Sequence, residues 1–129
     1  MNKKLMIVLC AASLALCNGC ALLVVGGAAA AGAGAVAYTN GELKDTEGYS
    51  LDTVHSATLA GLHDMQYAVV SDAKDVNNAK ILARTATDTK IQIDLIKQSP
   101  TITEIHIRVA TFGDEQLSRQ ILEKIKAHL

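Results

Sequence analysis

The stretch KIQIDLIKQSPTITEIHIRVAT, residues 90–111, decides the fold because apolar and polar side chains alternate in both of its halves. Successive side chains of a β-strand point to opposite faces, so each half predicts a strand with one apolar and one polar face. Ser99 and Pro100 mark the turn between the halves. Two antiparallel strands with one face in the core and one in water are therefore expected. The apolar set is Ile91, Ile93, Leu95, Ile105, Ile107 and Val109, and the polar set is Gln92, Asp94, Glu104, His106 and Arg108.

One helix is expected before this strand pair in the sequence, and another is expected after it. In LDTVHSATLAGLHDM, residues 51–65, apolar side chains recur at helical spacing, and Ser50 can cap the first turn. Gly61 weakens this helix but permits close approach of the sheet. In GDEQLSRQILEKIKAHL, residues 113–129, acidic residues begin the helix and basic residues end it, which matches the helix dipole.

Three further strands complete the predicted fold. The first strand of the domain is expected in NGELKDTEGYS, residues 40–50. Two more are expected in QYAVVS, residues 66–71, and AKILARTAT, residues 79–87, with DAKDVNN as the turn between them. The predicted class is α+β, an antiparallel β-meander with two helices on one face and the order β-α-β-β-β-β-α. This arrangement is the simplest one that buries both amphipathic patterns.

The front of the chain differs in composition from the rest. Residues 5–39 contain no charged side chain, whereas charges and amides recur from Asn40 onward. The second part, which begins near Tyr38, is long enough for one small domain. Before it, Lys3 and Lys4 precede LMIVLCAASLALC, residues 5–17. This apolar run has the length of a secretory signal and is too short to span a bilayer.

The signal ends in LALCNGC, residues 14–20, which resembles the lipobox of bacterial lipoproteins. In such proteins a cysteine thiol receives diacylglycerol, and the signal is cut just before that cysteine. The resemblance implies that Cys20 is the lipidated residue and that cleavage falls between Gly19 and Cys20. All three cysteines lie within the first twenty residues, so the domain has no disulfide framework and no cysteine metal site.

The expected organisation has three parts. They are a lipoprotein signal peptide at residues 1–19, a lipidated cysteine with an Ala/Gly-rich tether at residues 20–37, and a small α+β periplasmic domain at residues 38–129. An uncleaved N-terminal transmembrane helix is the alternative, but the alanines and glycines of the tether insert into membranes less readily than leucine. Ala21, not aspartate, follows Cys20. The resemblance then implies an outer-membrane protein on the periplasmic face.

Composition argues against a nucleic-acid partner. The chain has 12 basic and 13 acidic residues, and loss of Lys3 and Lys4 with the signal leaves 10 basic residues. A mildly acidic chain with three tyrosines and one phenylalanine has neither the basic surface nor the stacking platform that nucleic acids bind. The expected partners are the membrane, through the lipid, and an envelope protein, and no cofactor is expected.

Candidate catalytic residues are few. Asp52 and His55 are three positions apart on the first predicted helix and should be neighbours. His63 lies about 12 Å from His55 along that helix, too far to share one ion. No nucleophile elbow, phosphate loop or dinucleotide fingerprint is present in the sequence. A weakly metal-dependent periplasmic enzyme that uses Asp52 and His55 is therefore an alternative, and no dedicated metal site is expected.

Two longer stretches support a narrower resemblance: YTNGELKDTEGYSLDTVHSATLAGL, residues 38–62, and IHIRVATFGDEQLSRQILEKIKAHL, residues 105–129. Together with the lipobox and the tether, they resemble a family of short bacterial lipoproteins of unknown function. The resemblance implies a lipid anchor and a small α+β periplasmic domain, and it supplies no catalytic or binding residues. The expected function is a non-catalytic structural or adaptor module that binds an envelope component through its polar sheet face or an edge strand.

Overall fold

The computed structural model describes residues 36–129. In this part of the chain, six strands and two helices confirm the predicted α+β class. The observed order, β-β-α-β-β-β-β-α, adds one short strand, β1, to the predicted order. The elements are β1 (Ala37–Thr39), β2 (Glu42–Glu47), α2 (Leu51–Asp64), β3 (Ala68–Lys74), β4 (Asn78–Arg84), β5 (Lys90–Ser99), β6 (Ile102–Val109) and α3 (Glu115–Lys126).

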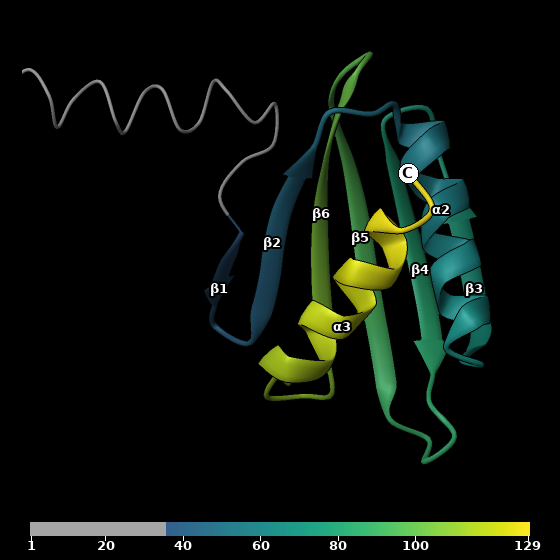
Figure 1. The fold of residues 1–129 in the computed structure, drawn as a ribbon, viewed down its shortest axis with the longest axis vertical. Coiled ribbons are helices and arrows are strands. Elements are labelled where there is room, and N and C mark those ends of the chain that lie inside the picture. Colours follow the sequence, from purple (N-terminus) through teal and green to yellow (C-terminus); the bar gives the residue numbers. More distant parts are fainter. Residues whose placement is uncertain (1–35) are drawn as a thin grey trace, which may run out of the picture. The chain divides into compact units, whose positions relative to one another are not determined.

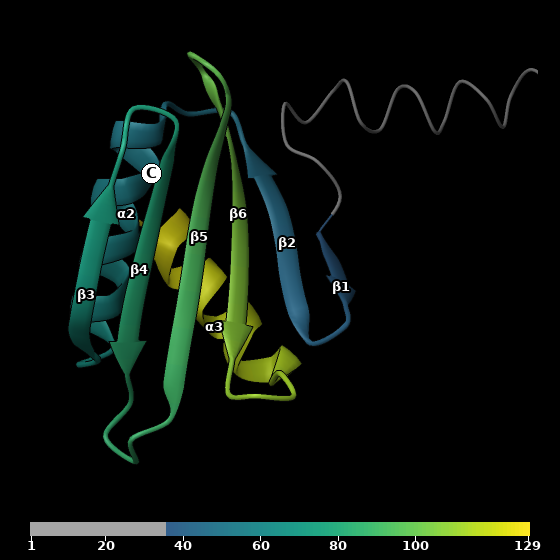
Figure 2. The same ribbon diagram turned by 180° about the vertical axis from the view of Figure 1, so that it is seen from behind.

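The strands form one antiparallel sheet with the order β1-β2-β6-β5-β4-β3. Strands β3 to β6 make the predicted meander, and β2 joins it beside β6. Figures 1 and 2 show the sheet from opposite sides and place α2 and α3 on the same face. We call this covered face the inner face and the opposite one the outer face.

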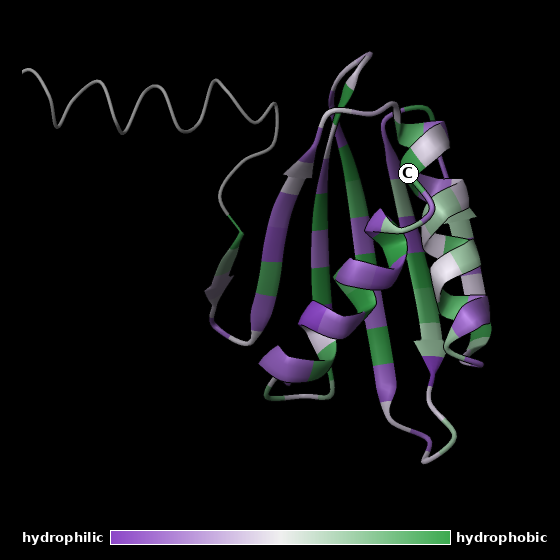
Figure 3. Cartoon of the chain, in the orientation of Figure 1, coloured by the Kyte–Doolittle hydropathy of each residue, from purple (hydrophilic) through white to green (hydrophobic). Residues whose placement is uncertain are grey.

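Strand register sorts the side chains of the β5–β6 pair between the two faces. Ile93 of β5 lies opposite Ile81 of β4 and Ile107 of β6, and all three are buried against the helices. Asp94 and His106 lie opposite each other on the outer face. Figure 3 shows the alternation as polar and apolar bands along the strands. The predicted two-faced strands are thus confirmed, and the core lies between the inner face and the helices.

Each helix begins at a polar capping residue. The Ser50 hydroxyl accepts a hydrogen bond from the Thr53 N–H at 3.3 Å, as predicted, and the Asp114 carboxylate accepts one from the Leu117 N–H at 3.0 Å. These caps satisfy backbone donors that have no partner inside the helix. The buried helix residues are Leu51, Val54, Ala57, Thr58, Gly61 and Leu62 of α2, and Ser118, Ile121, Leu122 and Ile125 of α3.

The prediction of a turn from residue 72 is wrong, because β3 continues to Lys74. Asp72 pairs with Ile81 of β4, and Lys74 pairs with Ala79. Aspartate and lysine are poor strand formers, but pairing with a neighbouring strand overrides that weak preference.

The predicted role of Gly61 also needs correction. A Cβ atom at this position would lie 3.1 Å from the backbone nitrogen of Ile125 and 3.1 Å from the carbonyl carbon of Lys124. The close approach that Gly61 permits is therefore between α2 and α3, and not between α2 and the sheet. The sequence could not show this because the two helices are far apart along the chain.

Candidate functional site

The predicted lipid-attachment site lies outside the described residues. Gly19 and Cys20 belong to the part of the chain before residue 36, as do the signal peptide and nearly all of the tether. Within residues 36–129, neither helix has the length and apolar character needed to cross a membrane.

The structure does not pair Asp52 with His55. Nε2 of His55 lies 2.8 Å from a carboxylate oxygen of Asp72 on β3, and Asp52 forms an ion pair with Lys74 of the same strand. The hydrogen bond and charge of Lys74 hold the pKa of Asp52 below its usual value. Both residues therefore connect α2 to β3. In the described part of the chain, no three His, Cys, Asp or Glu side chains are grouped to hold a metal ion.

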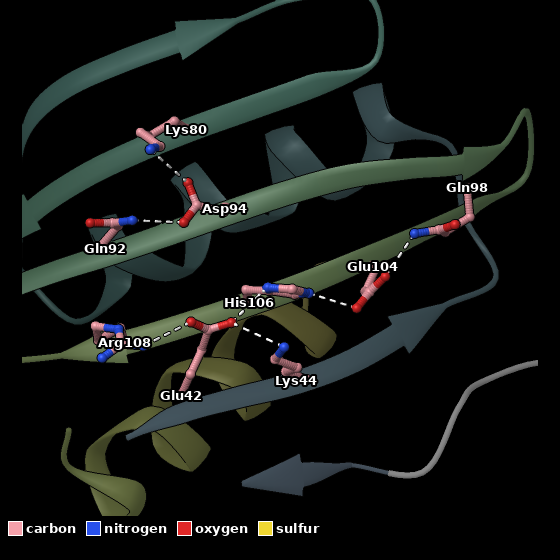
Figure 4. Close-up of polar contacts among 9 residues, drawn as sticks. All are labelled: Glu42, Lys44, Lys80, Gln92, Asp94, Gln98, Glu104, His106 and Arg108. Atoms are coloured by element: carbon pink, nitrogen blue, oxygen red, sulfur yellow. Dashed lines mark hydrogen bonds and ion pairs between the residues drawn. The ribbon is translucent and has the colours of Figure 1, made fainter. Parts of the chain in front are cut away.

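Two adjacent groups of interacting polar side chains lie on the outer face, which neither helix covers (Figures 2 and 4). The side chains come from β2, β6, β5 and β4, so residues that are far apart in the sequence lie side by side on this face. The alternation in residues 90–111 correctly predicted the outer-face members on β5 and β6 except Gln98. We call this set the outer network, and it consists of Glu42, Lys44, Lys80, Gln92, Asp94, Gln98, Glu104, His106 and Arg108.

Glu42 is the most connected member of the outer network. Its carboxylate lies 3.1 Å from an Arg108 guanidinium nitrogen, 2.7 Å from Nδ1 of His106 and 3.7 Å from Nζ of Lys44. Partial burial raises the pKa of the Glu42 carboxyl, but the Arg108 hydrogen bond and the charges of His106 and Lys44 outweigh burial. The pKa of Glu42 is therefore held below its usual value.

His106 lies between two carboxylates. Its Nδ1 faces Glu42 at 2.7 Å, and its Nε2 faces Glu104 at 2.6 Å. A carboxylate accepts hydrogen bonds, so the ring satisfies both contacts only when each nitrogen carries a proton. A second contact from the Gln98 amide to Glu104, at 2.7 Å, fixes that carboxylate. The imidazole ring is thus held in one orientation from both sides.

Asp94 organises the part of the outer network on β5 and β4. It accepts a hydrogen bond from the Gln92 amide at 2.7 Å, and Nζ of Lys80 lies 3.5 Å away. A shallow hollow of about 440 Å³ opens beside Lys80, Asp94, Ile96 and His106. The network therefore presents fixed donors and acceptors of both charges around a shallow surface.

An ionic cluster on the inner face was missed at the level of sequence. Asp45 and Glu47 of β2 are only 2% and 7% exposed. Nζ of Lys126, at the end of α3, lies 2.7 Å from Oδ2 of Asp45 and 3.1 Å from Oε1 of Glu47. The available signal was the alternation in ELKDTE, residues 42–47, which puts both carboxylates on the same face as Leu43.

These features define a class of protein: a small antiparallel α+β domain with helices on one sheet face and interacting polar side chains on the other. The chain belongs to the family described as Protein of unknown function (DUF3568), whose model matches residues 3–128. The match spans both the apolar front of the chain and the folded domain. A search of curated proteins found no match.

Proposed function

We propose that this chain is a lipid-anchored envelope protein whose folded domain is a non-catalytic binding module in the periplasm. The sequence LALCNGC supports the anchor, with Cys20 as the lipidated residue and Gly19 before the cleavage point. Ala21 supports sorting to the outer membrane. In bacterial lipoproteins an aspartate directly after the lipidated cysteine would oppose such sorting, and this chain has alanine there. The family model matches residues 3–128, so it covers the apolar front of the chain as well as the folded domain.

The observation that carries the binding role is the outer network. Its side chains come from four strands, are fixed by mutual hydrogen bonds and ion pairs, and remain uncovered by either helix. Charged groups that are held in place before binding lose little freedom when a complementary surface docks. A polar protein surface in the envelope is the partner that this face suits.

The β3 edge is a less suitable docking site than the outer face. Although β3 is exposed along its whole length, its pairing with β4 is irregular between Val69 and Ser71. Asp72 and Lys74 point from this edge strand toward α2, where they bind His55 and Asp52. Bulges and inward-pointing charges on an edge strand discourage the addition of another strand. We therefore assign partner binding to the outer face.

The anchor is tested by mass spectrometry of the protein extracted from membranes. We expect a chain that begins at Cys20 and carries added acyl mass. Cys20→Ala should abolish both the processing and the acylation, whereas the control Cys17→Ala should retain them. Recovery of an intact Met1 terminus on a membrane-bound chain would contradict the proposal and favour an uncleaved transmembrane helix.

The binding face is tested by photocrosslinking in cells. A photoreactive amino acid at Gln92 or Arg108 of the outer face is expected to give the same adduct, whereas the matched position Gln120, exposed on α3, should give none. Charge reversal by Glu42→Lys should reduce the adduct at Gln92, because it places a like charge beside Arg108, which lies opposite Gln92 in the sheet. No adduct from the outer face, or the same adduct from Gln120, would refute the assignment of this face.

A further inference from the structure

The most exposed large apolar side chain in the described part of the protein is Phe112. It is 92% exposed, compared with 75% for Val76, and it lies in the turn between β6 and α3. Phenylalanine is normally among the more buried residue types, and Phe112 is the chain's single phenylalanine. Either a binding partner or the packing of the turn must explain why this ring lies in water.

The turn that carries Phe112 is braced by the backbone of the β1–β2 turn. Gly41 and Gly113 have φ angles of +78° and +87°, and their backbones are in direct contact. A Cβ atom on Gly41 would lie only 2.6 Å from the carbonyl oxygen of Phe112. The Tyr38 hydroxyl packs against Gly113 on the same side. The two turns pack through backbone atoms and the Tyr38 hydroxyl, and the Phe112 ring takes no part in this packing. The ring therefore stays in solvent.

The turn that carries Phe112 and the turn that packs against it contain no charged residue. The two turns that meet here are Asn40–Gly41 and Ala110–Gly113, and neither contains an acidic or a basic residue. Asp114, the first charged residue after the turn, uses its carboxylate to cap α3. An exposed apolar ring at the tip of a turn can insert at the interface of a lipid bilayer, where Trp, Phe and Leu side chains contribute the apolar contact of peripheral segments.

We propose that Phe112 inserts into the lipid bilayer that carries the anchor, so that the β6–α3 turn is a second membrane contact of this protein. This inference rests on the proposed lipid anchor at Cys20. Only 16 residues separate Cys20 from β1, and a fully extended chain of that length reaches about 55 Å. The domain is thereby kept close to the bilayer, and a contact too weak to bind a free protein becomes effective through the high local concentration.

A bilayer fits this tip better than a protein pocket does. Aromatic residues that dominate protein interfaces are surrounded by further contacts that exclude water. Phe112 instead stands alone among small and polar neighbours, namely Ala110, Thr111 and Gly113. A lipid interface needs no shaped complement and accepts a single protruding ring.

The chain contains no tryptophan, so Phe112→Trp creates a single fluorescent reporter. The full lipidated variant is reconstituted into phosphatidylethanolamine and phosphatidylglycerol vesicles, with and without brominated acyl chains. Val76→Trp is the matched control, because Val76 is also highly exposed but lies in the β3–β4 turn. We expect a blue shift and loss of emission with brominated lipid for Trp at position 112, and neither change for Trp at position 76.

Emission at position 112 that is quenched no more than emission at position 76 would overturn the proposal. Shielding in native membranes without quenching in pure lipid vesicles would also overturn it, since the partner would then be a protein. Failure of the anchor is separable, because mass spectrometry reports it independently of fluorescence. If Cys20 proves unmodified, the same reporter chain is coupled through its N-terminal cysteine thiols to a maleimide lipid in the vesicles, and absence of quenching in that tethered chain refutes insertion.

Discussion

Replacing Lys126 with methionine is expected to lower the free energy of unfolding by about 3 kcal/mol at pH 7. Nζ of Lys126 is the positive group that faces the buried carboxylates of Asp45 and Glu47, at 2.7 and 3.1 Å. Those two facing oxygens have no other hydrogen-bond partner within the described residues. Methionine keeps most of the side-chain stem but leaves two negative charges without compensation. Denaturant unfolding at pH 7 measures the loss.

The loss should shrink in acid. Burial, with the nearby Asp45 carboxyl, raises the pKa of Glu47, although Lys126 opposes that rise. A carboxyl with a raised pKa in the folded state binds its proton more tightly there, so its ionisation costs stability as pH increases above about 4.5. Without Lys126 this cost grows at neutral pH and disappears once Glu47 is protonated. The difference in the free energy of unfolding between the variant and the wild type should therefore shrink as the pH is lowered from 7 toward 4.5.

Two controls separate charge from packing in this prediction. Lys124→Met changes an exposed lysine in the same helical turn and should cost no more than about 0.5 kcal/mol. Combining Lys126→Met with Asp45→Leu and Glu47→Met replaces the whole cluster by apolar side chains and should recover most of the stability. Equal losses in the single and triple variants would show that packing by Lys126, and not its charge, stabilises the cluster.

The strands could be predicted from the sequence where the alternation of apolar and polar residues matches one buried and one exposed face. The alternation in residues 90–111 predicted both central strands and their faces, because β5 and β6 are covered on one side only. Strand β3 was harder, since all of its residues are exposed and no apolar pattern marks its end. Its extension to Lys74 depends on pairing with β4, which the local sequence does not encode.

In the candidate site, too, the local pattern predicted some residues, whereas the role of others depends on strand pairing. Residues 90–111 identified His106 and Arg108 as outer-face residues from alternation alone. Their common partner Glu42 comes from a strand more than 60 residues earlier in the chain, so its role required the β2–β6 pairing. Asp52 and His55 lie three positions apart on α2, as predicted, but each contacts a partner on β3 and not the other. Asp72 and Lys74 supply those partners from β3, at long sequence separation.

Replacing Gly113 with alanine is expected to lower the free energy of unfolding by about 3 kcal/mol. The φ angle of +87° is unfavourable for a residue with a Cβ atom, and that atom would lie 2.4 Å from the Gly41 Cα and 2.4 Å from the Tyr38 hydroxyl. The Tyr38 hydroxyl can shift, but the Gly41 backbone is fixed between two paired strands. The two turns must therefore separate, and denaturant unfolding should show the loss.

Neighbouring substitutions give this prediction its controls. Gly48→Ala, at an exposed glycine whose φ is not positive, should change stability by no more than about 0.5 kcal/mol. Phe112→Ala should also be nearly neutral, because the ring is exposed and contributes little to the core. Full stability of Gly113→Ala would contradict the backbone contact between the turns.

Adding Tyr38→Phe to Gly113→Ala removes the hydroxyl overlap and leaves the Gly41 overlap in place. The double variant should therefore recover only part of the lost stability. Complete recovery would instead assign the strain to the tyrosine, and the β1–β2 turn would no longer account for the rigid presentation of Phe112. A partial recovery, together with a neutral Phe112→Ala, would show that the fold stabilises the turn but gains nothing from the ring that the turn exposes.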